Sequence, residues 1–337
     1  MNIWLILLTT ICFGIITTPL VIKFAIKFGF VDKPNERKVH TNSIPRLGGL
    51  AIYSSFILGS TLLYFYTGIF NGKENLYFAL VIGGSIIAGT GIIDDKFELS
   101  PMKKLLGQIL AAITVMVMNI QVLWISNPFS DTNDMISLGV FSIPITLFWI
   151  IGITNAVNLV DGLDGLAGGI SGIAALSIAI IAFLAGQFQT GIVALLLVAS
   201  LIGFLIFNFH PAKIFMGDIG SMFLGFILSV LTMQELKQLT LLGVMVPILL
   251  LAIPILDTLY AMIRRKFNHK PIFAPDKHHL HHRLLKRGFS QRKAVLVIYG
   301  ISLSFATLGI LIPYLTTWAI IAIFVVLLAI FQYIYNS

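Results

Sequence analysis

Long apolar stretches separated by short polar segments run through the whole chain. Eleven of them approach the roughly 20 residues that an α-helix needs to cross a bilayer. Backbone in lipid must satisfy its own hydrogen bonds, and these stretches are too long for barrel strands, so the pattern predicts an all-α polytopic membrane protein. The expected spans are residues 2–24, 48–70, 76–93, 103–124, 140–158, 166–186, 190–208, 218–235, 239–262, 293–313 and 316–335.

Composition agrees with this pattern and predicts a single membrane domain over residues 1–337. The chain is 58% hydrophobic and 11% charged, whereas soluble proteins carry roughly 25% charged residues. Cys12 is the single cysteine, so neither an internal disulfide nor a cysteine metal site can form. Residues 1–22 lack a basic leader and a cleavage site of small residues, which predicts a retained helix rather than a signal peptide.

The distribution of basic residues predicts which side of the membrane each loop faces. With the N-terminus outside and the C-terminus cytoplasmic, 20 of the 22 Lys and Arg lie in or beside cytoplasmic segments, and only Lys73 and Lys237 lie outside. This bias follows the positive-inside rule and explains most of the +8 net charge, so no nucleic-acid partner is expected. The expected cytoplasmic loops are near residues 25–47, 94–102, 158–165, 209–218 and 263–292.

Five aspartates stand at the expected cytoplasmic ends of apolar stretches, where an acidic residue near lipid is costly and therefore a candidate for function. They are Asp94, Asp95, Asp161, Asp164 and Asp218. Asp94 and Asp95 are adjacent at the end of the third stretch, and paired carboxylates at a helix C-terminus require a cation nearby. The available cations are a metal ion, Lys96, Lys103 and Lys104.

The segment NAVNLVDGLDGLAGG, residues 155–169, combines amides, carboxylates and glycines. Asn155, Asn158 and Asp161 recur every three residues, which places neighbouring members on adjoining faces of one helix. The glycines permit a broken helix and close approach of a ligand to the backbone. Amide and carboxylate oxygens suit Mg²⁺. A glycine-rich helix-packing segment is the alternative, but it does not explain two Asn and two Asp.

Two further segments add candidates for the same site. In NFHPAKIFMGDIGSMFLG, residues 208–225, Asp218 stands where the eighth stretch begins, and it could be only a helix N-cap. Lys213 is a candidate phosphate contact five residues earlier. Near the end of the first basic segment, His40 and Arg46 either line this site or belong to a plain solvated loop.

The last long cytoplasmic segment holds five of the seven histidines of the chain. Four of them are clustered: His278, His279, His281 and His282. A zinc site is one interpretation, and a solvated basic face without a role is another. The surrounding positive charge disfavours a dication and favours an anion such as diphosphate. The charges belong to Lys277, Arg283, Lys286 and Arg287.

Several segments together resemble the polyprenyl-phosphate N-acetylhexosamine-1-phosphate transferases: HTNSIPRLGG, DDK, NAVNLVDGLDGLAGG, NFHPAKIFMGDIGS and HHLHHRLL. The form DKHHLHHRLL is similar to the WecA/TagO-like branch, which uses UDP-GlcNAc and starts teichoic acid, O-antigen or common-antigen synthesis. The other main branch transfers UDP-MurNAc-pentapeptide in peptidoglycan synthesis and usually has three consecutive histidines. The resemblance implies transfer of GlcNAc-1-phosphate from UDP-GlcNAc to undecaprenyl phosphate, with release of UMP, at the cytoplasmic face of the bacterial inner membrane.

The resemblance also implies roles for individual residues. Asp218 and Asn158 are the implied Mg²⁺ ligands, with Mn²⁺ as a substitute metal. Asp94 and Asp95 are expected beside the polyprenyl phosphate, and Asp161 beside the diphosphate; these three and Asp218 are the expected catalytic residues. The expected substrate contacts are Arg46, Lys103, Asn155, Asn158, Asp164, Lys213, His279, His281, His282 and Arg283. A homodimer is a further expectation.

Two other classes of protein fit part of the pattern. A transporter or lipid flippase fits eleven helices, but its polar groups are expected near the middle of the membrane, whereas these lie at one face. A metal-binding or metal-exporting protein could be built on the clustered histidines. A P-loop of the form GxxxxGK[ST] does not occur in the sequence, so ATP hydrolysis of that type is not expected.

Overall fold

A computed structural model describes residues 2–32, 43–126, 135–236, 245–269 and 279–336. Helices dominate it, which confirms the all-α prediction. They are α1 (Ile3–Phe28), α2 (Gly48–Thr67), α3 (Glu74–Phe78), α4 (Gly84–Phe97), α5 (Pro101–Val117), α6 (Ser142–Val160), α7 (Leu166–Leu184), α8 (Phe188–Asn208), α9 (Gly217–Leu236), α10 (Met245–Leu250), α11 (Ala252–Phe267), α12 (Leu280–Lys286), α13 (Gln291–Leu311) and α14 (Thr317–Asn336). Two short antiparallel strand pairs lie in connections between helices. They are β1 (Val31–Asp32) with β2 (Ile44–Pro45), between α1 and α2, and β3 (Trp124–Ser126) with β4 (Met135–Ser137), between α5 and α6.

Nine helical segments among the described residues are long and apolar enough to cross a membrane. One of them, Glu74–Phe97, runs through α3 and α4, which a π-helical turn joins. The other two expected spans have a different form. Helix α5 has 17 residues, and the stretch 239–262 holds α10 and the start of α11, which are interrupted at Leu251. Residues 239–244 of that stretch lie outside the described residues, and the eleven-span topology stays a prediction.

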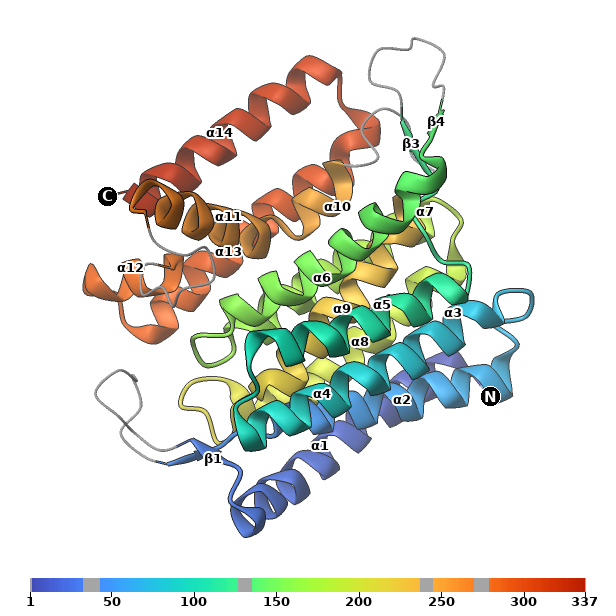
Figure 1. Cartoon of the computed structure of the whole chain (residues 1–337), viewed down its shortest axis with the longest axis vertical. Coiled ribbons are helices and arrows are strands. Elements are labelled where there is room, and N and C mark those ends of the chain that lie inside the picture. The colour runs from blue at the N-terminus through green and yellow to red at the C-terminus, as the bar shows by residue number, and fades with distance from the viewer. Residues whose placement is uncertain (1, 33–42, 127–134, 237–244, 270–278, 337) are drawn as a thin grey trace.

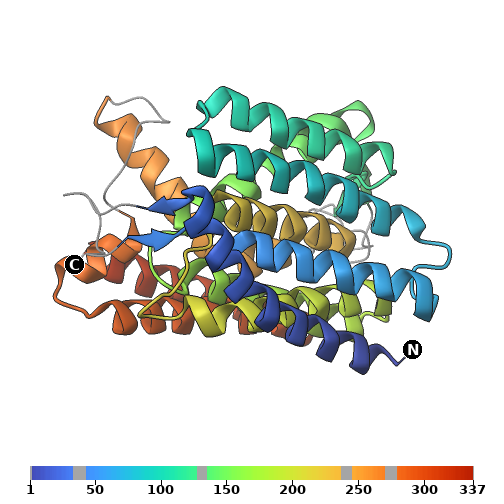
Figure 2. The ribbon, with the colours of Figure 1, turned by 90° about the horizontal axis from the view of Figure 1, so that it is seen from below.

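The long helices form one bundle (Figure 1). Helix α1 begins at one end of it and α14 finishes at the other, as both views show (Figures 1 and 2). The C-terminus of α4, the turn between α6 and α7, the start of α9 and the short helix α12 all lie at the end where α14 finishes. We call this the site end, because all five aspartates singled out in the sequence lie in these elements.

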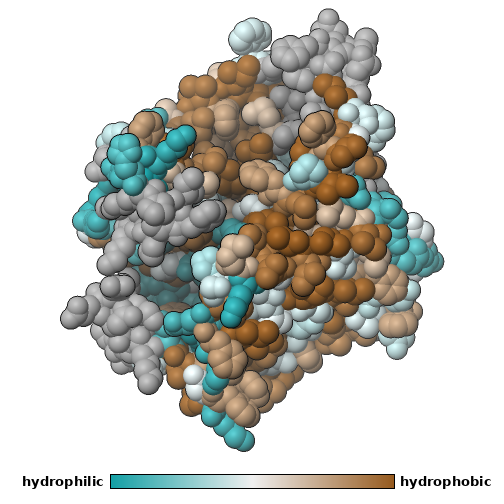
Figure 3. All heavy atoms as spheres, viewed as in Figure 1, coloured by the Kyte–Doolittle hydropathy of each residue, from teal (hydrophilic) through white to brown (hydrophobic). Residues whose placement is uncertain are grey.

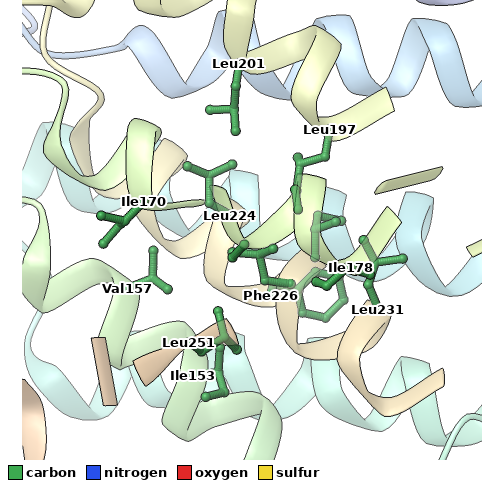
Figure 4. Packing of buried hydrophobic residues seen from close by; sticks show 14 of the residues in the cluster. Ile153, Val157, Ile170, Ile178, Leu197, Leu201, Leu224, Phe226, Leu231 and Leu251 are labelled. Carbon is green, nitrogen blue, oxygen red and sulfur yellow. The ribbon is translucent and has the colours of Figure 1, made fainter. Parts of the chain in front are cut away.

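Helix α9 lies at the centre of the bundle and packs against α2, α4, α6 and α7. Figure 4 shows its residues Phe226 and Leu231 among apolar side chains of the neighbouring helices, including Ile153 and Leu197. All four side chains are almost completely buried. Because lipid is as apolar as these side chains, close packing rather than removal from water holds such helices together.

Glycines allow the backbones around α9 to approach closely. A Cβ added to Gly49 of α2 would lie 2.0 Å from the backbone nitrogen of Gly220 in α9. One added to Gly225 would lie 2.7 Å from the Cα atom of Thr154 in α6. A side chain at either glycine would therefore push two backbones apart. The first turn of α9, which carries Asp218, is held in this way against the helices that form the site end.

Candidate active site

The carboxylate of Asp218 contacts groups from three other parts of the chain. Its Oδ1 accepts a hydrogen bond from Nδ2 of Asn158 at 2.5 Å. Its Oδ2 lies 3.6 Å from Nη2 of Arg46 and 3.6 Å from Nζ of Lys104. Asn158 also donates to the hydroxyl of Ser221 at 2.8 Å, one turn further along α9. The two residues expected to bind Mg²⁺ are thus in direct contact, and two basic groups border them.

Asp94 lies in the last turn of α4 and is 2% exposed. Its Oδ1 accepts a hydrogen bond from the backbone nitrogen of Leu99 at 2.8 Å, which closes the turn into α5. Its Oδ2 forms an ion pair with Lys104, and the carboxyl groups of Asp94 and Asp218 contact each other. Three lysines were expected to offset the charges of Asp94 and Asp95. Of these, Lys104 contacts Asp94, and it also reaches Asp218.

Asp95 has a different environment from its neighbour, because its carboxylate has no exposed surface. Its Oδ1 accepts hydrogen bonds from Nε and Nη2 of Arg46 at 3.1 and 2.9 Å, and from the backbone nitrogen of Asp218 at 3.1 Å. Its Oδ2 accepts from the backbone nitrogen of Ile219 at 3.3 Å. Asp95 therefore supplies the acceptors that the first turn of α9 needs, and the carboxylate of Asp218 is left to face the site.

Asp161 follows the last residue of α6 and adds a fourth carboxyl group to this cluster. Burial, and then the charges of Asp218, Asp95 and Asp164, raise the pKa of Asp161 to about 8. Burial lowers the pKa of Arg46, but the charge of Asp95 and other nearby carboxylates outweighs it, and the net shift is upward. The upward shift of Asp161 follows mainly from burial, and both shifts also contain the effect of an excess of carboxylates over cations around Asp218.

This excess fits a divalent cation. Four carboxyl groups and two basic side chains meet in the cluster, and a bound dication would favour the ionised form of the carboxyl groups. The residues are Asp94, Asp95, Asp161 and Asp218 with Arg46 and Lys104. Among the described residues, no three His, Cys, Asp or Glu side chains are arranged to hold a metal by themselves. That is compatible with Mg²⁺, which usually takes one or two carboxylates together with water and substrate phosphates.

Asp164 organises the segment between α8 and α9. Its Oδ2 lies 2.7 Å from Nδ1 of His210 and accepts a hydrogen bond from the backbone nitrogen of Ala212 at 3.1 Å. Asn208 accepts from the backbone of Gly165 at 3.0 Å and donates to the carbonyl of Ile214 at 2.8 Å. The two sequence motifs that contain these residues are thus bound to each other, and one oxygen of Asp164 already has protein partners.

His281, one of the clustered histidines, lies against the turn between α6 and α7. His281 is 3% exposed, and a Cβ added to Gly162 would lie 2.3 Å from its Nε2 atom. Burial, and then the neighbouring His282, lower the pKa of His281 to about 3, so this ring is neutral near pH 7. The glycine was expected to admit a ligand, and here it admits a histidine side chain. The contact brings the histidine segment beside the acidic cluster.

The same geometry bears on the zinc interpretation. Within the described part of the histidine segment, no metal-binding group of three ligands is formed. The ring of His279 has Asp257 as its partner, and the rings of His281 and His282 lie 4.2 Å apart between centroids. His278 and the preceding residues 270–277 lie outside the described residues, as does His40 of the first basic segment.

Four of the expected substrate contacts have other surroundings. Asn155 donates to the side-chain oxygen of Gln108 at 2.8 Å, one helical turn deeper in the bundle than Asn158. The guanidinium of Arg283 lies 4.1 Å from the centre of the Tyr335 ring in α14. The remaining two, Lys103 and Lys213, are exposed at the surface of the site end. Their roles toward a substrate stay predictions.

The expected set omits several residues that contact its members, among them Lys104, His210, Ser221 and Asp257. Ser221 follows Asp218 by three residues, so helical spacing could have indicated it. Asp257 is an isolated acidic residue in an apolar stretch, which is itself a signal. No sequence pattern indicates His210, because its partner comes from another motif.

The fold and the site define an integral membrane protein with a buried acidic cluster and basic side chains at one end of its helical bundle. The family described as glycosyl transferase family 4 matches residues 77–235. A probable undecaprenyl-phosphate N-acetylglucosaminyl 1-phosphate transferase of Bacillus subtilis is 43% identical over 95% of this chain and 87% of the relative. A decaprenyl-phosphate N-acetylglucosaminephosphotransferase of Mycolicibacterium smegmatis is 37% identical over 82% of this chain and 73% of the relative.

A third relative is an undecaprenyl-phosphate alpha-N-acetylglucosaminyl 1-phosphate transferase of Escherichia coli K12, which is 30% identical over 93% of this chain and 85% of the relative. The chain belongs to this family of polyprenyl-phosphate N-acetylhexosamine-1-phosphate transferases, as its motifs predicted.

Proposed function

We propose that this protein transfers GlcNAc-1-phosphate from UDP-GlcNAc to undecaprenyl phosphate, giving undecaprenyl-diphosphate-GlcNAc and UMP. The observation that carries the proposal is 43% identity, over 95% of the chain, to a relative named for GlcNAc-1-phosphate transfer. The names of the other two relatives favour UDP-GlcNAc over the UDP-MurNAc-pentapeptide alternative. They name both undecaprenyl and decaprenyl lipids, so the length of the lipid is part of the proposal.

The site end is proposed to face the cytoplasm from the bacterial inner membrane. The positive-inside bias supports this orientation, because 20 of the 22 basic residues belong to the expected cytoplasmic side. Figure 3 shows hydrophilic side chains gathered toward the site end, whereas the flank that α4, α5 and α6 present is largely hydrophobic. The product would then enter a cell-envelope polymer such as teichoic acid.

The lipid phosphate is proposed to approach from the side of α4 and α5. These helices expose a row of apolar side chains beside Asp94 and Lys104, which suits contact with lipid chains. The row consists of Phe97, Met102, Leu106 and Leu110. A phosphate that follows such a chain would meet Lys104 first, and the nucleotide sugar would enter on the water-facing side, near the turn between α6 and α7.

The proposed reaction is attack of a lipid phosphate oxygen on the β-phosphorus of UDP-GlcNAc. The second pKa of a phosphate monoester is about 6, so the nucleophile is already ionised and needs no strong base. Both oxygens of Asp94 have partners in the protein, which suits positioning of Lys104 better than formation of an aspartyl-phosphate. Lys104 and Arg46 would offset negative charge that builds up around the transferred phosphoryl group.

Mg²⁺ is proposed as the cofactor, held by Asp218 and Asn158 together with phosphate oxygens of the substrate. When bound there, the ion would neutralise the diphosphate and stabilise the UMP that leaves. The protein's own part is to present the two ligands without rotational freedom. Asn158 is fixed by Ser221, and the backbone of Asp218 is fixed by Asp95.

Release of UMP by purified protein with Mg²⁺, undecaprenyl phosphate and UDP-GlcNAc tests the proposal. The same assay with UDP-MurNAc-pentapeptide should give far less UMP. Asp218→Asn should abolish release without a change in thermal stability, while Glu74→Gln, an acid-to-amide change at the other end of the bundle, should leave release unchanged. Near-normal turnover of Asp218→Asn would show that the metal assignment is wrong. Transport into proteoliposomes without UMP release would favour a transporter.

A further inference from the structure

A buried aspartate outside the acidic cluster holds the histidine segment in place. Asp257 lies in α11 and is 1% exposed. Its Oδ2 lies 2.8 Å from Nδ1 of His279, and its Oδ1 accepts a hydrogen bond from the backbone nitrogen of Leu280 at 2.9 Å. His279 precedes the first residue of α12 and makes no capping hydrogen bond with its own side chain. One carboxylate therefore caps α12 and orients the histidine before it.

A second histidine, His281, connects the Asp257–His279 pair to the acidic cluster. The rings of His279 and His281 are parallel within 1°, with centroids 5.9 Å apart. His281 in turn lies against Gly162, next to Asp161. Asp257, His279 and His281 thus form a line of buried side chains from α11, through α12, to the turn between α6 and α7.

We infer that Asp257 is a positioning residue for the nucleotide-sugar side of the site. It keeps the proton of His279 on Nδ1, so that Nε2 is the nitrogen offered to a ligand, and it seats His281 against the Gly162 turn. The inference rests on the proposed function. The described residues give Nε2 of His279 no hydrogen-bond partner, whereas Nδ1 is engaged with Asp257.

Chemistry distinguishes this role from simple packing. A buried carboxylate is costly unless its hydrogen bonds are made, and here both oxygens have partners. An asparagine at position 257 has nearly the same shape and can still accept from Leu280 through its single carbonyl oxygen. Its amide nitrogen would then donate to Nδ1 of His279, which forces the ring proton onto Nε2. The Asp257→Asn change therefore keeps the helix cap and reverses the orientation of the histidine proton.

The experiment combines kinetics with a double-mutant cycle. Asp257→Asn should lower kcat/KM for UDP-GlcNAc by roughly 10-fold to 100-fold, by analogy with the loss of the partner that orients a metal-binding histidine. The KM for undecaprenyl phosphate should stay within about twofold, because the lipid is proposed to meet Lys104 on the other side of the site. Thermal stability in detergent should be retained.

The cycle uses His279→Gln as the second change. If Asp257 acts through the ring of His279, adding Asp257→Asn to His279→Gln should lower kcat/KM little further. The losses in kcat/KM from the two single changes will then not add. Additive losses would show that Asp257 serves only as a cap, and an unchanged kcat/KM would also overturn the inference. Glu74→Gln is the acid-to-amide control. Absence of UMP release by the unmodified protein would instead refute the proposed function.

Discussion

A single methyl group at Gly162 should separate the histidine segment from the acidic cluster. In Gly162→Ala the new Cβ would lie 2.3 Å from Nε2 and 2.5 Å from Cε1 of His281. Non-bonded atoms need about 3.5 Å, so the ring or the turn must move by about 1 Å. The backbone of Gly162 has no positive φ, so alanine meets no strain of its own. The ring cannot swing into solvent freely, because it is buried beside His279.

A misplacement of this size at a catalytic site costs about 100-fold in rate, or about 2.7 kcal/mol of transition-state stabilisation. We therefore expect Gly162→Ala to release UMP about 100 times more slowly. Either movement has this effect, because a displaced ring removes His281 from the site and a displaced turn carries Asp161 with it. The assay is UMP release under saturating substrates, with thermal stability measured in parallel.

Gly152→Ala is the matched control. Gly152 lies ten residues earlier in α6, and a Cβ added there meets nothing within 4 Å, so turnover should be unchanged. In a His281→Ala background the clash is absent, and Gly162→Ala should then cost only a few-fold beyond the loss from His281→Ala. Wild-type turnover in Gly162→Ala would refute the claim that the histidine segment and the acidic turn form one site.

Three other changes test the packing and electrostatics. Arg46→Met leaves the buried carboxylate of Asp95 without its ion partner and should destabilise the protein by roughly 3 kcal/mol, measured by denaturation in mixed micelles. Gly49→Ala should reduce accumulation of folded protein in membranes, because its Cβ would strike the backbone of α9 at 2.0 Å, whereas Gly89→Ala in α4 should not. His281 has a folded-state pKa of about 3, below about 6.5 in the unfolded chain, so the stability that its neutral ring contributes is complete above pH 6.5 and is lost toward pH 3. Between pH 7.5 and pH 5 the unmodified protein should therefore lose about 2 kcal/mol of stability relative to His281→Gln, because the buried carboxyl groups titrate alike in both proteins. Equal slopes in both proteins would contradict this.

Local patterns were sufficient to predict an all-α chain of long apolar helices, and they indicated most of the residues that the structure brings together at the site end. Apolar length alone indicates helices such as α8 and α13, because lipid leaves the backbone no alternative. The same constraint makes polar residues at helix ends conspicuous, so Asp94, Asn158 and Asp218 stood out without any knowledge of the fold. The interruption of α10 and α11 at Leu251 was not predicted, since the residues on both sides of it are apolar.

Only the tertiary structure shows which partner each residue of the site has. Asp94 and Asp95 are adjacent and chemically identical in the sequence, yet Asp94 pairs with Lys104 and Asp95 caps α9 beside Arg46. Successive residues of a helix point in different directions, so their partners depend on which helices pack around them.

The apolar and polar order of the residues determined that this chain forms membrane helices with charged ends, because burial of a lone charge or of unsatisfied backbone in lipid is too costly to allow otherwise. The convergence of those ends depends on contacts between residues far apart in the chain. That convergence requires two close approaches, of Gly49 to Gly220 and of Gly162 to His281. One methyl group at either place would hold the segments apart. Such steric fits depend on three-dimensional distances that no spacing along the chain encodes.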